Sequence, residues 1–320
     1  MPEEKKDSGL IVVGGLPRSG TSLFQQMLEA HPNIWGGPEF EHLEPIVKLY
    51  NSLLHGIREG RIDTICNQQQ VVSAIHDLIT GLLTHRLNDQ QLHYVSEKTP
   101  SNLVVFQQLA GILPHARFIW VLRDPRAVIS SLKEVRKRGS RKVGRDVTGS
   151  VAQNVMAMNR MVNKGFASMD ACAGRFMFVK YEALIHAPEP VARKVCEFLN
   201  LEWSDQMLSP EKYRQSSKQH MVDQVWYTEE MYTRKIDASS ENAWRKKLTP
   251  GEQYLVNKVF AKQKRLVELG YDFSNRVGLL GQLEGWLRYY VGLKILLSLK
   301  HRLYLLLRYK LKVIVPPQYD

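Results

Sequence analysis

The chain has few of the features that stabilise small secreted proteins or metal-binding modules. Its 320 residues include 3 cysteines, Cys66, Cys172 and Cys196, which lie far apart and form no CxxC pair. This spacing excludes a zinc finger and argues against a disulfide framework, so we expect reduced thiols that pack in the interior. The first nine residues are polar and charged and carry no apolar segment of a signal peptide or anchor. We therefore expect a cytoplasmic protein.

Signatures of nucleic-acid binding and of repeats are missing as well. The sequence has no aromatic-rich RNA-binding motif, no coiled-coil heptads and no internal repeat, so we expect no nucleic-acid partner. What the chain does have is an excess of positive charge, a net +12 with a pI of about 9.5. That balance favours acidic partners such as nucleotides, acidic peptides, polyanionic sugars or anionic lipid. The length and the 44% apolar content suit one large α/β domain, alone or with an extension.

The most specific motif is the stretch from Gly15 to Ser22, Gly-Leu-Pro-Arg-Ser-Gly-Thr-Ser. It follows an apolar run at 10–13 and precedes apolar residues at helical spacing, which is the strand, loop and helix of a phosphate-binding loop. The spacing matches G-x-x-x-x-G-K-[ST] with one departure, because Thr21 stands where nucleotide triphosphatases carry lysine. The cation is instead Arg18, inside the loop. This departure argues against ATP and Mg²⁺ chemistry, and we expect no metal site.

The loop has the chemistry of an anion site. Backbone N–H groups at the start of the following helix are unpaired, and the helix dipole favours negative charge there. Gly15 and Gly20 allow the backbone to curl closely, and Ser19, Thr21 and Ser22 add hydroxyl donors. A tight turn without a ligand would not need an arginine and three hydroxyls at this spacing. We therefore interpret these residues as a phosphate cradle.

Strand and helix patterns alternate along the chain. Short apolar runs predict strands, and apolar residues three and four apart predict helices. This order predicts an α/β fold with a P-loop-like central parallel sheet flanked by helices on both faces. Ligands of such sheets bind beyond the carboxyl ends of the strands, where the loop, Lys98, Arg123 and Tyr181 fall. We expect a first strand at 10–14, a short strand at 94–96 and buried strands at 118–122 and 176–179. We expect helices at 22–30, 42–54, 70–87 and 102–113 and from Pro125, and a loop at 35–38.

Four stretches resemble the PAPS-dependent sulfotransferases, which move a sulfuryl group from 3′-phosphoadenosine-5′-phosphosulfate (PAPS) to a hydroxyl or amine. Their sequences are most similar to those of the tyrosylprotein sulfotransferase and related bacterial branch. The resemblance spans about residues 10 to 270. Of the four stretches given next, the first and the last are specific for this family, and the middle two are suggestive of it. The stretches are Val13–Thr21, Leu28–Pro32, Glu97–Pro100, and Val121–Ala127 followed by Ser131.

The resemblance implies a nucleotide site. The loop would bind the 5′-phosphosulfate through Arg18, Ser19, Gly20, Thr21 and Ser22. Because sulfuryl transfer leaves negative charge on the phosphate, fixed cations at the bridging oxygen would stabilise it. Arg18 and Lys98 form the natural pair for that role. The alternative for Lys98 is a solvated lysine.

The same resemblance places the rest of the nucleotide. Arg123 and Ser131 would hold the 3′-phosphate, the first as a fork from the end of a strand and the second about two turns into the next helix. Tyr181 would contact the nucleotide. Ser240 would lie in a late segment that folds over the cofactor, although Asn242 stands where the compared branch has serine. The alternatives are an ion pair between Arg123 and the next residue, and a packed tyrosine at the end of a strand.

The candidate general base is Glu39. An acceptor hydroxyl with a pKa of roughly 10 needs a base, and Glu39 occupies the position of the family glutamate counted from Arg18. The tyrosylprotein enzymes have two adjacent glutamates, of which the Pro38-Glu39 pair retains the second. Other branches use histidine, so His42 is the rival. Glu39 can also be read as an acid that stabilises the start of a helix.

The end of the sequence is basic and apolar. From Gly285 to Asp320 there are seven lysines and arginines against one acid, which supplies +6 of the net +12. Its apolar runs are shorter than the ~18 residues of a membrane span, so we expect a helix that lies on a membrane surface or docks a protein. The alternative is a helix packed on the catalytic domain under lysine stems. We accordingly expect a sulfotransferase domain at 1–275 and a helical extension at 276–320.

These observations predict a PAPS-dependent sulfotransferase that acts on a hydroxyl. Resemblance and charge favour tyrosine in an acidic peptide, and a carbohydrate, a lipid or a small-molecule alcohol remain alternatives. Acceptor specificity would reside in segments 41–91 and 214–238. A P-loop kinase that uses ATP is a second hypothesis, for which Asp124 is the candidate Mg²⁺ ligand. A membrane-tethered nucleotide-binding scaffold is a third, and the joint presence of Arg18, Lys98 and Glu39 argues against it.

Overall fold

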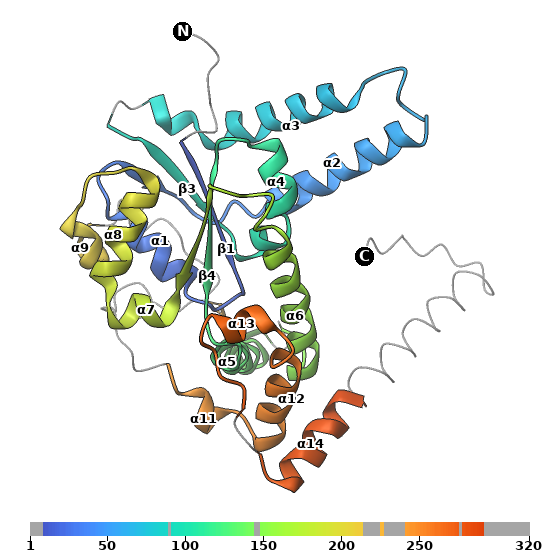
Figure 1. The fold of residues 1–320 in the computed structure, drawn as a ribbon, viewed down its shortest axis with the longest axis vertical. Coiled ribbons are helices and arrows are strands. Elements are labelled where there is room, and N and C mark those ends of the chain that lie inside the picture. Colours follow the sequence, from blue (N-terminus) through green and yellow to red (C-terminus); the bar gives the residue numbers. More distant parts are fainter. Residues whose placement is uncertain are drawn as a thin grey trace. The chain divides into compact units, whose positions relative to one another are not determined.

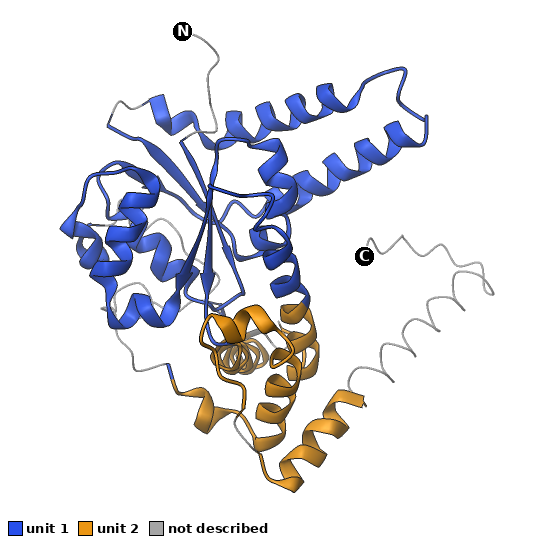
Figure 2. Cartoon of the chain, in the orientation of Figure 1, with its two compact units in different colours: residues 1–124, 160–241 blue, residues 125–159, 242–320 orange. Residues whose placement is uncertain are grey.

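The computed structural model describes residues 9–88, 91–143, 148–213, 225–226, 241–274 and 277–290. The chain divides into two compact units, shown in Figure 2. The first unit comprises residues 1–124 and 160–241, and the second comprises residues 125–159 and 242–320. The expected boundary at residue 275 remains a prediction, since this division follows spatial contacts rather than the order of the sequence.

A parallel sheet forms the centre of the first unit, and its strands run in the order β2-β3-β1-β4-β5. The central strand β1 places Val13 opposite Lys98 on one side and Ile119 on the other. Because every pairing is parallel, the carboxyl ends of the strands meet at one edge. The strands are β1 (Leu10–Gly15), β2 (Ile34–Gly36), β3 (Tyr94–Lys98), β4 (Arg117–Leu122) and β5 (Phe176–Lys180).

Helices cover both faces of this sheet, as the sequence predicts (Figure 1). One face of β1 and β4 buries alternate residues such as Val13 and Val121 in a core cluster with Phe24 of α1 (Thr21–Glu29). Two later helices, α7 (Tyr181–His186) and α8 (Pro188–Leu199), complete this layer. The period of two along a strand sends the intervening residues to the other face.

The opposite layer is aromatic. The Phe118 ring centroid lies 5.3 Å from that of Phe106 on α4 (Phe106–Ile112). The Trp120 ring centroid lies 4.9 Å from that of Phe166 on α6 (Val151–Ala167). Strands β1 and β4 are therefore buried on both faces, which explains why they appear in the sequence as continuous apolar runs.

Two long helices connect β2 to β3. They are α2 (Leu43–Arg58) and α3 (Gln68–Leu83), which contact each other and extend from the sheet (Figure 1). Asn67 begins α3 with a capping box to Gln70, which satisfies two N–H groups at the helix start. The shorter helices of this unit are η1 (His85–Asn88), η2 (Pro100–Val104), η3 (Asp205–Leu208) and α9 (Pro210–Tyr213).

The structure corrects the sequence-based elements mainly at the sheet edges. Residues 34–36, of which 35–36 fall in the expected loop, form β2, because three residues suffice when β3 supplies the pairing. The expected buried strand at 176–179 is an edge strand whose side chains are mostly half-buried. The expected helix at 102–113 divides into η2 and α4. Pairing and packing decide these segments, and local patterns do not report them.

The second unit is helical among its described residues. It contains α5 (Pro125–Val143), α11 (Trp244–Lys247), α12 (Pro250–Phe260), α13 (Lys264–Glu268) and α14 (Leu279–Tyr289), together with the first part of α6. Pro125 stands at the start of α5, as expected. The guanidinium carbon of Arg126 lies 4.2 Å from the centroid of the buried Trp244 ring. That contact ties α5 to α11.

Candidate active site

The phosphate-binding loop joins β1 to α1 and has two left-handed residues. Gly20 has φ +96°, and Arg18 has φ +73°. A Cβ atom on Gly20 would lie 2.2 Å from a ring carbon of Tyr181, and one on Gly15 would lie 2.6 Å from the carbonyl oxygen of Val121. Only glycine fits these two positions, because the backbone presses against β4 and α7.

The loop presents donors that suit an anion. The first turn of α1 has no side-chain cap, so the N–H groups at its start keep their capacity to bind an anion. The Ser19 hydroxyl oxygen is fully buried and forms no hydrogen bond within the described part of the chain. A buried polar group in this state calls for a partner. A bound phosphate or sulfate group would satisfy the hydroxyl and the helix start together.

Arg123 and Tyr181 close the loop from the ends of β4 and β5. The buried Arg123 donates from Nη1 to the carbonyl oxygen of Arg18 over 3.1 Å. Its guanidinium carbon also lies 4.1 Å from the centroid of the Tyr181 ring, a cation–π distance. The sequence predicted that these residues share one edge of the sheet, and they do.

Arg18 projects from the loop towards a distant part of the chain. Its Nη1 atom donates to the carbonyl oxygen of Trp226 over 2.7 Å. The contact fixes the guanidinium of a half-buried side chain. Sequence reasoning could not find it, because the acceptor is a backbone carbonyl 208 residues away.

Lys98 connects the loop to the candidate base. The lysine is buried at the end of β3, and its ammonium forms an ion pair with the Glu39 carboxylate. The same Nζ atom lies 3.4 Å from the hydroxyl oxygen of Ser22 in the first turn of α1. The side chain is therefore not the solvated lysine of the alternative reading. A cation and a carboxylate lie beside the start of the helix that would bind the anion.

A buried carboxylate, Glu97, holds the segment that carries Glu39. A single oxygen of this carboxylate, Oε1, accepts two hydrogen bonds. One comes from the backbone N–H of Phe40 at 3.2 Å and the other from the Thr99 hydroxyl at 2.6 Å. Thr99 in turn accepts from the backbone N–H of Glu41 at 3.2 Å. Both residues that follow Glu39 are thereby bound to the end of β3.

The fixed segment has an unusual backbone and environment. Glu41 adopts φ +59°, a left-handed conformation that costs a non-glycine residue energy unless its surroundings impose it. Burial raises the pKa of Glu97, and the hydrogen bonds from Thr99, Asn102 and Phe40 oppose that rise. Glu97 stands in the Glu97–Pro100 stretch of the sequence, which predicted no role for it. Its signal was alternation, which sends Glu97 and Lys98 to opposite faces of β3.

The rival base is placed differently. His42 is exposed just before α2, where its Nδ1 atom contacts the carbonyl oxygen of Phe40. No contact described for it joins it to the loop, whereas Glu39 reaches the loop through Lys98. The geometry therefore favours Glu39.

Two further predicted residues remain, Ser131 and Ser240. Ser131 lies half-buried on α5, in the second unit. Ser240 lies outside the described residues. Their roles at the nucleotide remain predictions, and no group of three or more His, Cys, Asp or Glu side chains suited to a metal occurs among the described residues.

A glycine-bounded loop between a central strand and a helix, with cations at neighbouring strand ends, is typical of P-loop-like α/β proteins that bind an anion. Residues 11–205 match the family described as the Sulfotransferase family. This match covers more than half of the chain, and the chain belongs to that family.

The chain is also similar to individual sulfotransferases. The chain is 32% identical over 212 residues to Protein-tyrosine sulfotransferase 1 of Danio rerio, which covers 65% of this chain and 57% of the relative. It is 26% identical over 290 residues to Protein-tyrosine sulfotransferase of Drosophila melanogaster, covering 88% of this chain and 56% of the relative. The chain thus spans little more than half the length of these curated relatives.

A solved structure shares the fold. The sulfotransferase domain from the curacin biosynthetic pathway aligns with a TM-score of 0.55 and 18% identity, over 80% of this chain and 96% of that domain. The expected α/β architecture is thereby confirmed. In the part of the chain that the structure describes, no helix has the length and apolarity needed to cross a membrane.

Proposed function

We propose that the protein transfers a sulfuryl group from PAPS to the hydroxyl of tyrosine in a protein or peptide. Membership of the sulfotransferase family supports the reaction, and the names of the curated relatives support the acceptor. The net charge of +12 suits an acidic peptide. The observation that carries the proposal is the position of Lys98, whose ammonium meets both Glu39 and the hydroxyl of Ser22 in the loop helix.

Separate groups of this site would bind the donor, stabilise the leaving phosphate and deprotonate the acceptor. The open N–H groups of α1 and the Ser19 hydroxyl bind the phosphosulfate. PAPS, when bound, supplies the sulfuryl group, whose bond to the 5′-phosphate breaks as the bond to the acceptor oxygen forms. Lys98 and Arg18 stabilise the negative charge that the leaving phosphate gains. Glu39 takes the proton of the acceptor hydroxyl.

In this scheme Lys98 also positions the Glu39 carboxylate. Held at the end of β3, its ammonium keeps the Glu39 carboxylate within reach of the loop before any acceptor arrives. A carboxylate fixed in advance loses little freedom when the hydroxyl binds, which is how positioning lowers a barrier. Arg123 and Tyr181, which contact the loop and each other, would hold the nucleotide beyond the ends of β4 and β5.

The test is transfer of radioactive sulfur from ³⁵S-labelled PAPS. The acceptors are an acidic tyrosine peptide, its phenylalanine counterpart, a glycan, a lipid and a small phenol. We expect label in the tyrosine peptide alone among the two peptides, and a loss of kcat of roughly 100-fold or more in Glu39→Gln. PAP affinity, measured by calorimetry, should stay within about twofold of the wild type because Glu39 does not bind the phosphates.

The outcomes separate the parts of the proposal. Label in the glycan, lipid or phenol alone would keep the reaction and overturn the acceptor. Normal turnover by Glu39→Gln would overturn the base assignment. If the protein bound PAP but labelled none of the five acceptors, the proposed transferase activity would be overturned. ATP bound more tightly with Mg²⁺ than PAP would instead favour the kinase.

A further inference from the structure

The helix α14 packs on α12 through glycine. Its buried residues are Gly281 and Gly285, one turn apart on the same side. A Cβ atom on Gly285 would lie 2.6 Å from the carbonyl oxygen of Gly251, and one on Gly281 would lie 2.7 Å from the Cβ of Pro250. The two helix backbones therefore touch, which only glycine permits.

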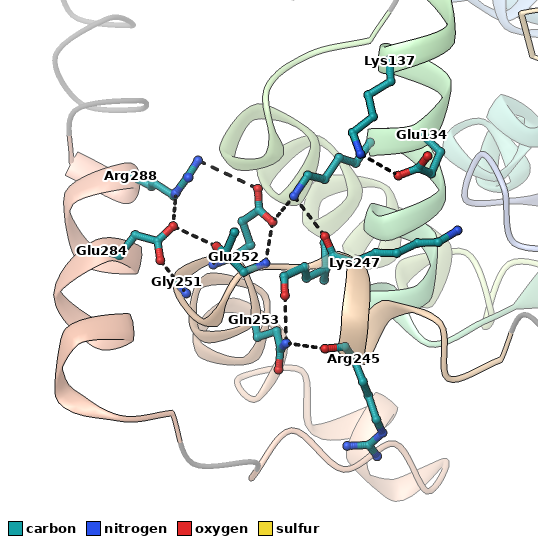
Figure 3. Close-up of polar contacts among 12 residues, drawn as sticks. Glu134, Lys137, Arg245, Lys247, Gly251, Glu252, Gln253, Glu284 and Arg288 are labelled. Carbon is teal, nitrogen blue, oxygen red and sulfur yellow. Dashed lines mark hydrogen bonds and ion pairs between the residues drawn. The ribbon is translucent and has the colours of Figure 1, made fainter.

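Charged groups hold the same side of α14, as Figure 3 shows. The Glu284 carboxylate accepts hydrogen bonds from the Thr249 hydroxyl at 2.8 Å, from the Gly251 N–H at 3.1 Å and from Arg288 at 2.9 Å. Partial burial alone would raise the pKa of Glu284, and these donors outweigh it and lower the pKa. The inward face of α14 is thus made of glycine and charge.

The outward face is apolar. Five large apolar side chains of α14 are exposed, and Leu279 and Leu280 are 83% and 85% exposed. This polarity is the reverse of that of an ordinary surface helix, which buries its apolar stripe. An apolar face left exposed while the polar face is docked points to an apolar surface as its partner. The five residues are Leu279, Leu280, Leu283, Trp286 and Leu287.

A basic cavity of about 430 Å³ adjoins this helix in the same unit. Five basic side chains and the Glu252 carboxylate line it, and the nearby carboxylates of Glu134 and Glu284 pair with two of the five, which leaves a formal balance of two positive charges. Arg288 enters the cavity wall from the inward side of α14, and the exposed basic side chains of the wall are those of Lys137 and Arg141 on α5. The basic residues are Lys133, Arg136, Lys137, Arg141 and Arg288.

We propose that the α14 apolar face and this basic cavity form a docking site for an anionic lipid surface. The cavity would receive headgroup phosphates, and the leucines with Trp286 would enter the boundary between headgroups and acyl chains. An interfacial helix needs one apolar face, and no helix among the described residues has the length and apolarity of a membrane span. A second copy of the chain would bring like charges together, so charge complementarity favours lipid.

Sedimentation of the full chain with vesicles tests this site. Vesicles of phosphatidylcholine with and without phosphatidylserine are compared at about 0.1 M salt, where exposed charges still attract at close range. We expect the wild type to sediment with the anionic vesicles. The double variants Leu280→Glu/Leu283→Glu and Lys137→Glu/Arg141→Glu should each lose about tenfold in partitioning. The matched control is Leu78→Glu/Leu82→Glu on α3, two leucines that are 42% and 48% exposed.

Three results would overturn the proposal. One is a wild type that stays in the supernatant with anionic vesicles. A second is equal sedimentation of Leu280→Glu/Leu283→Glu, which would assign binding to other parts of the chain. A third is a lipid-free dimer that this variant abolishes, which would show that a second copy covers the face. Circular dichroism checks that the variants fold. The assay contains no PAPS, so its result is independent of the proposed transferase activity.

Discussion

Two helix starts in this protein show opposite uses of the same chemistry. Helix α1 begins after Gly20 without a side-chain cap, beside the buried hydroxyl of Ser19. Helix α12 begins after Thr249 with a capping box to Glu252, and Glu284 accepts a further N–H there. One start keeps its donors open, and the other has filled them with carboxylates of its own chain.

The contrast distinguishes a ligand site from a packing site. Both regions use glycine for close backbone approach and both gather positive charge, so neither feature alone identifies a site. The two regions differ in whether their hydrogen-bond donors have partners. Side chains accept from the N–H groups at the start of α12, whereas the start of α1 has no side-chain cap and the Ser19 hydroxyl has no hydrogen-bond partner among the described residues. We therefore expect the nucleotide at α1 and structural effects alone at α12.

Gly20→Ala should have the largest effect on nucleotide binding. A Cβ atom there would overlap the Tyr181 ring at 2.2 Å, on a backbone with φ +96°. Overpacking and left-handed strain together cost about 2–4 kcal/mol, so PAP affinity should fall at least about tenfold by calorimetry. The control is Gly81→Ala on α3, where nothing lies within 4 Å of the new atom. Wild-type affinity in Gly20→Ala would contradict the cradle.

The second expected effect is that of Glu97→Gln on turnover. Glutamine keeps one acceptor oxygen for Phe40 and Thr99, but its amide hydrogens face the Asn102 donor. The segment with Glu39 should lose its fixed position, so kcat should fall about 10- to 100-fold with PAP affinity nearly unchanged. An exposed carboxylate, Glu59, provides the control Glu59→Gln. A parallel fall in PAP affinity would indicate a structural role instead.

The third expected effect is that of Gly285→Ala on stability. Alanine favours a helix over glycine by up to about 1 kcal/mol, yet its Cβ would lie 2.6 Å from the Gly251 carbonyl oxygen. Packing should prevail, and we expect a net loss of about 1–3 kcal/mol by urea unfolding. Gly81→Ala, in open space, should instead stabilise the protein. If both variants were stabilised, α14 would not pack on α12 as described.

The same contrast explains what the sequence could predict. The phosphate loop was readable because its strand, glycines, arginine and helix are consecutive. Lys98 and Arg123 could be placed from the ends of apolar runs, since parallel strands share an edge. The contact of Arg18 with Trp226 spans 208 residues, and that of Glu97 with Phe40 spans 57, so neither leaves a local pattern. The charge and the leucines of the C-terminal region are visible in the sequence, but the face of α14 that packs on α12 depends on Gly281 and Gly285.

The smallest expected effect is the acid sensitivity that Glu284 gives to the second unit. Its pKa is lowered in the folded protein, so its stabilising contribution is present above the unfolded value of roughly 4.3 and is lost as the pH falls through the folded value. Because the side chain is 35% exposed, screening should keep this contribution below about 1 kcal/mol. The variant Glu284→Gln should therefore unfold at a lower Tm than the wild type at pH 7, with the difference shrinking towards pH 3. A difference that grows with acid would show that the carboxylate does not cap α12.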